Sequence, residues 1–110
     1  MNEKYPVELG FYYHYKHDPQ GPINHHAYEV VGYGHHTEVE GLYESTMVIY
    51  RPLYKDAGVY KEGKHADLRP LAMFVEKVEK DGKVFDRFTK ITDEHVIHDL
   101  EIIKSEMYGE

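Results

Sequence analysis

His14 and Lys16 stand two positions apart in the aromatic run from Phe11 to Lys16. In an extended strand, residues two apart share one face, so the imidazole and the ammonium group would point the same way. Such a pair can bind a carboxylate or a phosphate, with Lys16 as the positive charge and His14 as a hydrogen-bond donor. The alternative is structural: His14 satisfies a backbone carbonyl, and Lys16 contacts only water.

A second pair, His36 and Glu38, has the same spacing. An imidazole held by a carboxylate can act as a general base. Neither a Gly-x-Ser-x-Gly motif nor a Cys accompanies this pair, so an exposed turn is the competing interpretation. Together with His14, the pair defines an enzyme hypothesis, a small hydrolase or a metal-dependent enzyme, which requires the three side chains to converge.

Arg69 precedes Pro70 and can offer a planar fork of donors to a ligand carboxylate or phosphate. Alternatively, it pairs with Glu38 or Glu40 and fixes a loop. Eleven Tyr residues add aromatic surface that could face a ligand. We predict no catalytic residue and the following ligand-binding set: His14, Lys16, His36, Glu38, Tyr50 and Arg69.

The nine His residues raise the question of a metal site. The adjacent pairs at 25–26 and 35–36 would point to opposite faces of a strand. His95 and His98 are three apart in a predicted helix and could face one metal, but a third ligand would have to come from elsewhere. We therefore predict no metal and no cofactor.

Composition limits the class of protein. The chain has 110 residues, 41% of them hydrophobic and 30% charged, which fits one globular domain. Its net charge of −7 makes nucleic acid an unfavourable partner. Cys is absent, and residues 1–10 lack the apolar core of a signal peptide, so we expect a cytoplasmic protein. No apolar run approaches the ~20 residues that span a bilayer.

The hydrophobic pattern predicts strands at 11–16, 27–33 and 46–50, and a short one at 59–60. In the second strand, Tyr28 and Val30 would share one face and Tyr33 would lie on the other, with a bulge suggested by Gly32 and Gly34.

Residues 74–88 predict a hairpin. Asp81-Gly82 is a strong two-residue turn signal, and it places Lys80 opposite Lys83 and Val78 opposite Phe85. The same register pairs Glu76 with Arg87, Lys77 with Asp86, and Val75 with Phe88.

The last segment has helical spacing. One stripe contains Val96, Leu100, Ile103 and Met107. Thr92 or Asp93 can cap the N-terminus of this helix, and Gly109 can end it. The stripe packs either on the strands of the same chain or on a second copy, as a homodimer.

A set of short segments in fixed order resembles the bacterial family catalogued as domain of unknown function 1653. The resemblance runs from about Gly10 to Ile91 and leaves out the helix. Its segments are Gly10, Tyr12 with His14-Tyr15-Lys16, Tyr28 to Gly32, His36-Thr37-Glu38, Tyr50-Arg51 with Leu53-Tyr54, Arg69 to Phe74, Asp81-Gly82-Lys83 and Arg87-Phe88.

The resemblance implies a small SH3-like barrel and brings no established activity. We therefore expect a mainly β fold, an SH3-like barrel or roll with a C-terminal α-helix. A single domain 1–110 would comprise an irregular lead-in at 1–9, the barrel at 10–91 and the helix at 92–108. The leading functional hypothesis is a non-enzymatic binding module for a peptide, a nucleotide or a small anionic ligand. The alternatives are the enzyme defined above and a structural or regulatory subunit that acts through its C-terminal helix.

Overall fold

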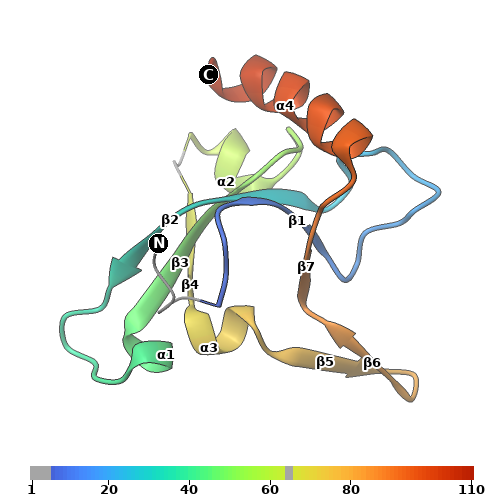
Figure 1. Cartoon of the computed structure of the whole chain (residues 1–110). Coiled ribbons are helices and arrows are strands. Elements are labelled where there is room, and N and C mark those ends of the chain that lie inside the picture. Colours follow the sequence, from blue (N-terminus) through green and yellow to red (C-terminus); the bar gives the residue numbers. More distant parts are fainter. Residues whose placement is uncertain (1–5, 64–65) are drawn as a thin grey trace.

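The computed structural model of the chain describes residues 6–63 and 66–110. In this part, strands rich in aromatic and β-branched residues form a five-stranded antiparallel sheet (Figure 1). The strand order is β4-β3-β2-β1-β7. The strands are β1 Gly10–His14, β2 Ala27–His35, β3 Thr46–Pro52, β4 Asp67–Pro70 and β7 Phe88–Lys90. Of the predicted lead-in at 1–9, residues 1–5 lie outside the described part.

The mainly β fold with a C-terminal helix is confirmed, but a closed barrel is not. The two edge strands, β4 and β7, do not pair with each other in the described part of the chain, so the sheet is open. Three short helices lie at its connections: α1 Leu42–Ser45, α2 Gly58–Lys61 and α3 Leu71–Phe74. The predicted strand at 59–60 is wrong, because these residues belong to α2.

A bulge in β2 sets which residues face inward. The pairing register with β3 shifts between Val30 and Gly32, as the two glycines predicted. The extra residue brings Tyr33 to the face of Tyr28 and Val30, where all three pack on one core. The prediction that Tyr33 lies on the opposite face is therefore wrong, because it assumed unbroken alternation.

The inner face of the sheet is the face that carries this first core. A short helix, α3, lies against it and buries Leu71 and Phe74. Residues 74–76 were predicted to begin the hairpin, but Phe74 ends α3 instead. The first core consists of Val7, Tyr12, Val30, Val48, Tyr50, Leu71, Phe74 and Phe88.

The hairpin is confirmed in its turn and register. Strands β5 (Lys77–Lys80) and β6 (Lys83–Asp86) meet at Asp81 and Gly82, whose φ angles are 53° and 76°. Lys80 pairs with Lys83, as predicted. The two strands form a separate, largely exposed ribbon that extends away from the main sheet (Figure 1). Phe88 does not continue the hairpin, because β7 pairs with β1.

The C-terminal helix α4, Glu94–Tyr108, begins and ends where its caps predicted. Asp93 Oδ1 accepts hydrogen bonds from the backbone N–H groups of His95 (2.9 Å) and Val96 (3.2 Å). Gly109 ends the helix with a φ of 72°. No helix in the described ranges is both long and apolar enough to cross a membrane.

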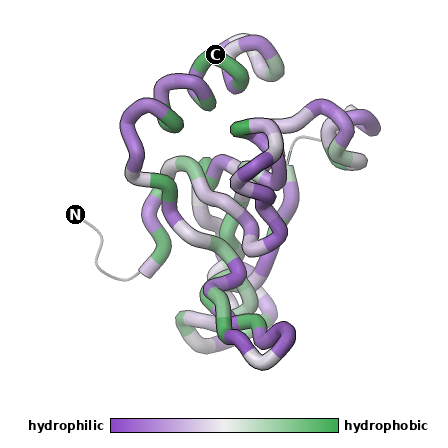
Figure 2. Tube along the Cα trace, turned by 90° about the vertical axis from the view of Figure 1, so that its right-hand side faces the viewer, coloured by the Kyte–Doolittle hydropathy of each residue, from purple (hydrophilic) through white to green (hydrophobic). Residues whose placement is uncertain are grey.

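The apolar stripe of α4 packs within the chain, against the outer face of the sheet. Leu100 is buried with Phe11, Ala27, Leu53 and Ile91 in a second core. Hydrophobic and hydrophilic residues alternate along α4 in Figure 2, as this one-sided packing requires. Packing on the strands of the same chain is the first of the two arrangements predicted for this stripe.

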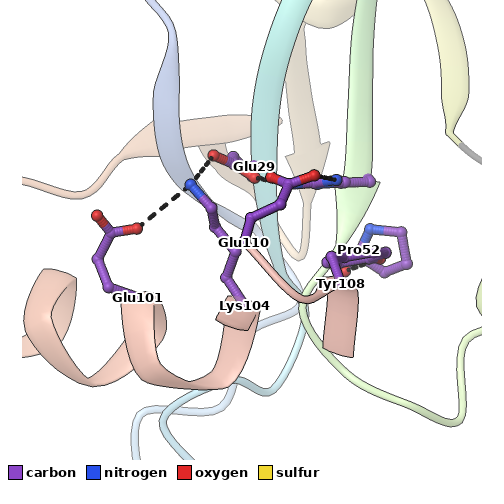
Figure 3. A network of polar contacts seen from close by, with 7 residues as sticks. Glu29, Pro52, Glu101, Lys104, Tyr108 and Glu110 are labelled. Atoms are coloured by element: carbon purple, nitrogen blue, oxygen red, sulfur yellow. Dashed lines mark hydrogen bonds and ion pairs between the residues drawn. The ribbon is translucent and has the colours of Figure 1, made fainter. Parts of the chain in front are cut away.

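A network of ion pairs holds α4 on this outer face (Figure 3). Arg51 and Glu29 are neighbours on β3 and β2, and Arg51 Nη2 lies 2.9 Å from Glu29 Oε1. The other oxygen of Glu29 accepts a hydrogen bond from Lys104 Nζ at 3.0 Å. Arg51 also lies 2.6 Å from Glu110 Oε1 and 4.0 Å from the centre of the Tyr108 ring.

Candidate functional site

Five inner-face side chains form a group that we call the Arg69 cluster: His14, Tyr28, Tyr50, Arg69 and Phe88. They come from five strands, β1, β2, β3, β4 and β7. The ring centres of His14 and Phe88 lie 5.2 Å apart, and those of Tyr50 lie 5.6 Å from Tyr28 and 5.5 Å from Phe88. These edge-to-face contacts build a packed, largely buried aromatic group beside one guanidinium group.

The positive charge of Arg69 is not neutralised by an ion pair with any carboxylate of residues 6–63 and 66–110. Its Nε donates a hydrogen bond to the Tyr50 hydroxyl at 3.1 Å. Its guanidinium carbon lies 6.0 Å and 5.8 Å from the ring centres of Tyr50 and Phe88. Neither Nη atom has a hydrogen-bond acceptor among these residues. The predicted alternative, an ion pair with Glu38 or Glu40, is therefore not formed.

His14 is held neutral beside several positive charges. Its Nδ1 accepts a hydrogen bond from the backbone N–H of Lys16 at 3.2 Å, so the neutral ring carries its proton on Nε2. Burial, together with the positive charges of His26, Lys16, Arg87 and Arg69, lowers the pKa of His14 to about 4. The neighbourhood of His14 therefore has a positive potential, although the whole chain has a net charge of −7.

Because the imidazole of His14 stays neutral in the folded protein, the stability of the fold should depend on pH. The pKa of His14 is about 4 in the folded state and ~6.5 in the unfolded state, so between these values only the unfolded chain takes up the proton. We expect the contribution of His14 to stability to be complete above pH ~6.5 and to be lost as the pH falls from ~6.5 to ~4. Histidine side-chain NMR across this range should show no protonation of His14 above pH ~5, and a midpoint near 6.5 would contradict the assignment.

His26 is the residue at this site that the sequence reasoning missed. It ends the loop before β2 with a φ of 50°, which is uncommon for a residue other than glycine. Its ring centre lies 5.7 Å from those of His14 and Tyr54. Its Nδ1 is buried and has no hydrogen-bond partner among the described residues. The sequence shows only an adjacent His pair at the end of a loop, which does not indicate this contact.

A pocket of about 630 Å³ adjoins the cluster. His26 and Tyr54 line it, and the Tyr54 hydroxyl forms a hydrogen bond with the hydroxyl of Tyr28 in the cluster. Ile103 and Met107 of α4 form an apolar part of its wall. This volume lies within the range of pockets that bind small molecules. The complete lining is Pro22, Asn24, His25, His26, Tyr54, Lys55, Asp56, Ile103, Glu106 and Met107.

The structure brings together three of the six predicted ligand-binding residues, His14, Tyr50 and Arg69. Lys16 is exposed in the turn after β1, and its charge acts on His14. The other two, His36 and Glu38, lie elsewhere.

His36 and Glu38 follow the far end of β2. His14 lies beside His26, just before that strand begins, and the nine residues of β2 span ~30 Å. The backbone N–H of Glu38 donates to His36 Nδ1 at 3.3 Å, and both residues are exposed, which matches the turn interpretation. The convergence that the enzyme hypothesis required therefore does not occur.

No group of three or more His, Asp or Glu side chains within the described ranges could hold a metal ion.

Comparison with protein families identifies the family of the chain. A family model with the description "Protein of unknown function (DUF1653)" matches residues 10–90, from β1 to the end of β7. No curated protein and no solved structure matches the chain. The matched range contains the whole Arg69 cluster, whereas α4 lies outside it.

Proposed function

We propose that this chain, which belongs to the DUF1653 family of proteins of unknown function, is a binding module that recognises a small anionic ligand at the Arg69 cluster. The half-buried guanidinium of Arg69 carries the proposal, because it lies on aromatic rings and is not paired with a carboxylate in the described part of the chain. Arg binds carboxylates and phosphates through two parallel hydrogen bonds, and both Nη groups of Arg69 lack a described acceptor.

The surroundings favour an anion over a neutral ligand. Lys16, Arg87 and Arg69 all act on His14 with positive charge, and the Nε2–H of neutral His14 is a further donor. The whole protein has a net charge of −7 and repels anions, so a region of positive potential is where an anion can approach.

The adjoining pocket has room for the rest of the ligand. His26 and Tyr54 contact both the cluster and the pocket, so an anionic group near His14 could continue into an uncharged body against Ile103 and Met107. We therefore expect an aromatic carboxylate to bind more tightly than acetate.

Titration of the isotopically labelled protein with inorganic phosphate, acetate and benzoate tests this function by NMR. We expect shifts at His14, His26 and Arg69, and about a 10-fold weaker affinity in R69Q, since a charge-assisted hydrogen bond contributes ~1.5 kcal/mol or more. The control is K61Q, which removes the positive charge of the exposed Lys61 in α2 and should leave the affinity unchanged. Equal affinity in R69Q and the native protein would reject the cluster as the binding site.

Protonation of His14 gives a second readout. An anion near His14 favours the charged imidazolium, so bound ligand should raise the pKa of His14 from its value of about 4. By linkage, the anion should bind more tightly at lower pH. An unchanged pKa of His14 at saturating ligand would place the anion elsewhere.

A further inference from the structure

A basic groove lies between the end of β1 and the β5–β6 hairpin. Its volume is about 320 Å³, and none of the Arg69 cluster residues lines it. The groove is lined by Tyr15, Lys16, Lys80, Asp81, Lys83 and Phe85.

The two faces of the hairpin differ in charge. Strand alternation and the pairing register place Lys80, Lys83 and Phe85 on one face, which is the face that lines the groove. The opposite face carries Lys77 and Asp86, which form an ion pair. The positive charge of the hairpin is therefore neutralised on one face and concentrated on the other.

The groove retains an unfavourable arrangement of charges. Lys80 and Lys83 lie directly opposite each other, and like charges in this position repel. In the part of the chain that the structure describes, none of Lys16, Lys80 and Lys83 forms an ion pair. Three ammonium groups therefore share the groove with the single carboxylate of Asp81, in a chain whose net charge is −7.

Two aromatic rings accompany these charges. Phe85 is 41% exposed, which is unusual for so apolar a side chain, and Tyr15 lies on the β1 side of the groove. Aromatic rings beside ammonium groups suit a ligand that has both a flat ring and phosphates, because bases stack on such rings.

We propose that this groove binds a nucleoside polyphosphate, with the phosphates between Lys16, Lys80 and Lys83 and the base against Phe85. The small volume of the groove and the acidic balance of the whole chain favour a mononucleotide over a long nucleic acid. The inference does not depend on the proposed function, because no residue of the Arg69 cluster lines the groove. Lys16 acts at both places, since its charge also reaches His14.

Titration of the full-length protein with ATP, inorganic triphosphate and adenosine tests the groove. We expect ATP to shift the signals of Tyr15, Lys83 and Phe85 and to bind about 10-fold more tightly than triphosphate, since stacking of one base contributes ~1–3 kcal/mol. Adenosine should bind more weakly still, because it has no phosphate. Equal affinities for ATP and triphosphate would overturn the role of the aromatic rings. A single-stranded oligonucleotide that binds while ATP does not would overturn the mononucleotide proposal.

Variants separate this site from its alternatives. The double variant K80Q/K83Q should weaken ATP at least about 10-fold. K77Q lies in the same hairpin on the opposite face and should stay within about 2-fold of the native affinity. These lysines are exposed, so the spectra away from the hairpin should confirm that the variants fold. R69Q should leave ATP affinity unchanged, and loss of ATP binding in R69Q but not in K80Q/K83Q would overturn the groove as the nucleotide site.

Discussion

Replacing Leu100 with Ala should lower the free energy of unfolding by about 3 kcal/mol, within the ~2–5 kcal/mol range for truncation of a buried Leu. Leu100 is fully buried at the centre of the contact between α4 and the sheet. The truncation removes apolar contacts with Phe11, Leu53 and Ile91 and leaves a cavity that the sheet backbone cannot close. Urea denaturation followed by circular dichroism measures the change.

The matched control is I102A, in the same helix. Ile102 is 50% exposed, so its truncation should change the free energy of unfolding by no more than ~0.5 kcal/mol. A loss below ~1 kcal/mol in L100A would mean that α4 does not dock on the sheet in solution.

Replacing Arg51 with Ala should lower the free energy of unfolding by about 2–4 kcal/mol, slightly less than the ~3–5 kcal/mol for breaking a fully buried ion pair. The side chains of Arg51 and Glu29 are each only 12% exposed. Without Arg51, the partly buried carboxylate of Glu29 keeps Lys104 as its one cationic partner among the described residues, and the Tyr108 ring loses the guanidinium packed over it. The retained Lys104 contact places the expected loss below that of an isolated buried charge.

Chemical denaturation of R51A beside K77Q checks this value. Lys77 and Asp86 also form an ion pair, but both side chains are more than half exposed, so K77Q should change stability by less than ~1 kcal/mol. The double variant E29Q/R51A should lose less than the sum of the two single changes, because no buried charge is left unpaired. Similar losses in R51A and K77Q would show that the network adds no more than a surface contact.

Local signals made the hairpin and the last helix predictable. Asp81-Gly82 alone sets the turn and the register, and Asp93 and Gly109 set the ends of α4. The positions of the glycines predicted the bulge, but the predicted face of Tyr33 was wrong. One inserted residue reverses the face of every residue that follows it in the strand. The four-residue helix α3 has too few residues for a helical period, and it forms where Leu71 and Phe74 reach the core.

The site was harder to predict because spacing along a strand says nothing about which strands meet. His14 and Arg69 were candidates by residue type alone, and their contact through Phe88 depends on the pairing of β1 with β7. His36 and Glu38 have the same spacing as His14 and Lys16 and lie at the other end of β2. His26 reaches His14 from a backbone conformation with a φ of 50°, which no pattern in the sequence indicates.

The position of β1 between β2 and β7 has a consequence for how the chain assembles. Tyr12 pairs with Tyr28 on one side and with Lys90 on the other. One edge of β1 therefore pairs with β7, a strand that comes much later in the chain. Closing so long a loop costs conformational entropy before its contacts form, which slows folding of β-rich topologies. Before β7 pairs during folding, β1 exposes a row of unpaired backbone N–H and C=O groups beside Phe11 and Tyr13. Such an edge is a template for aggregation.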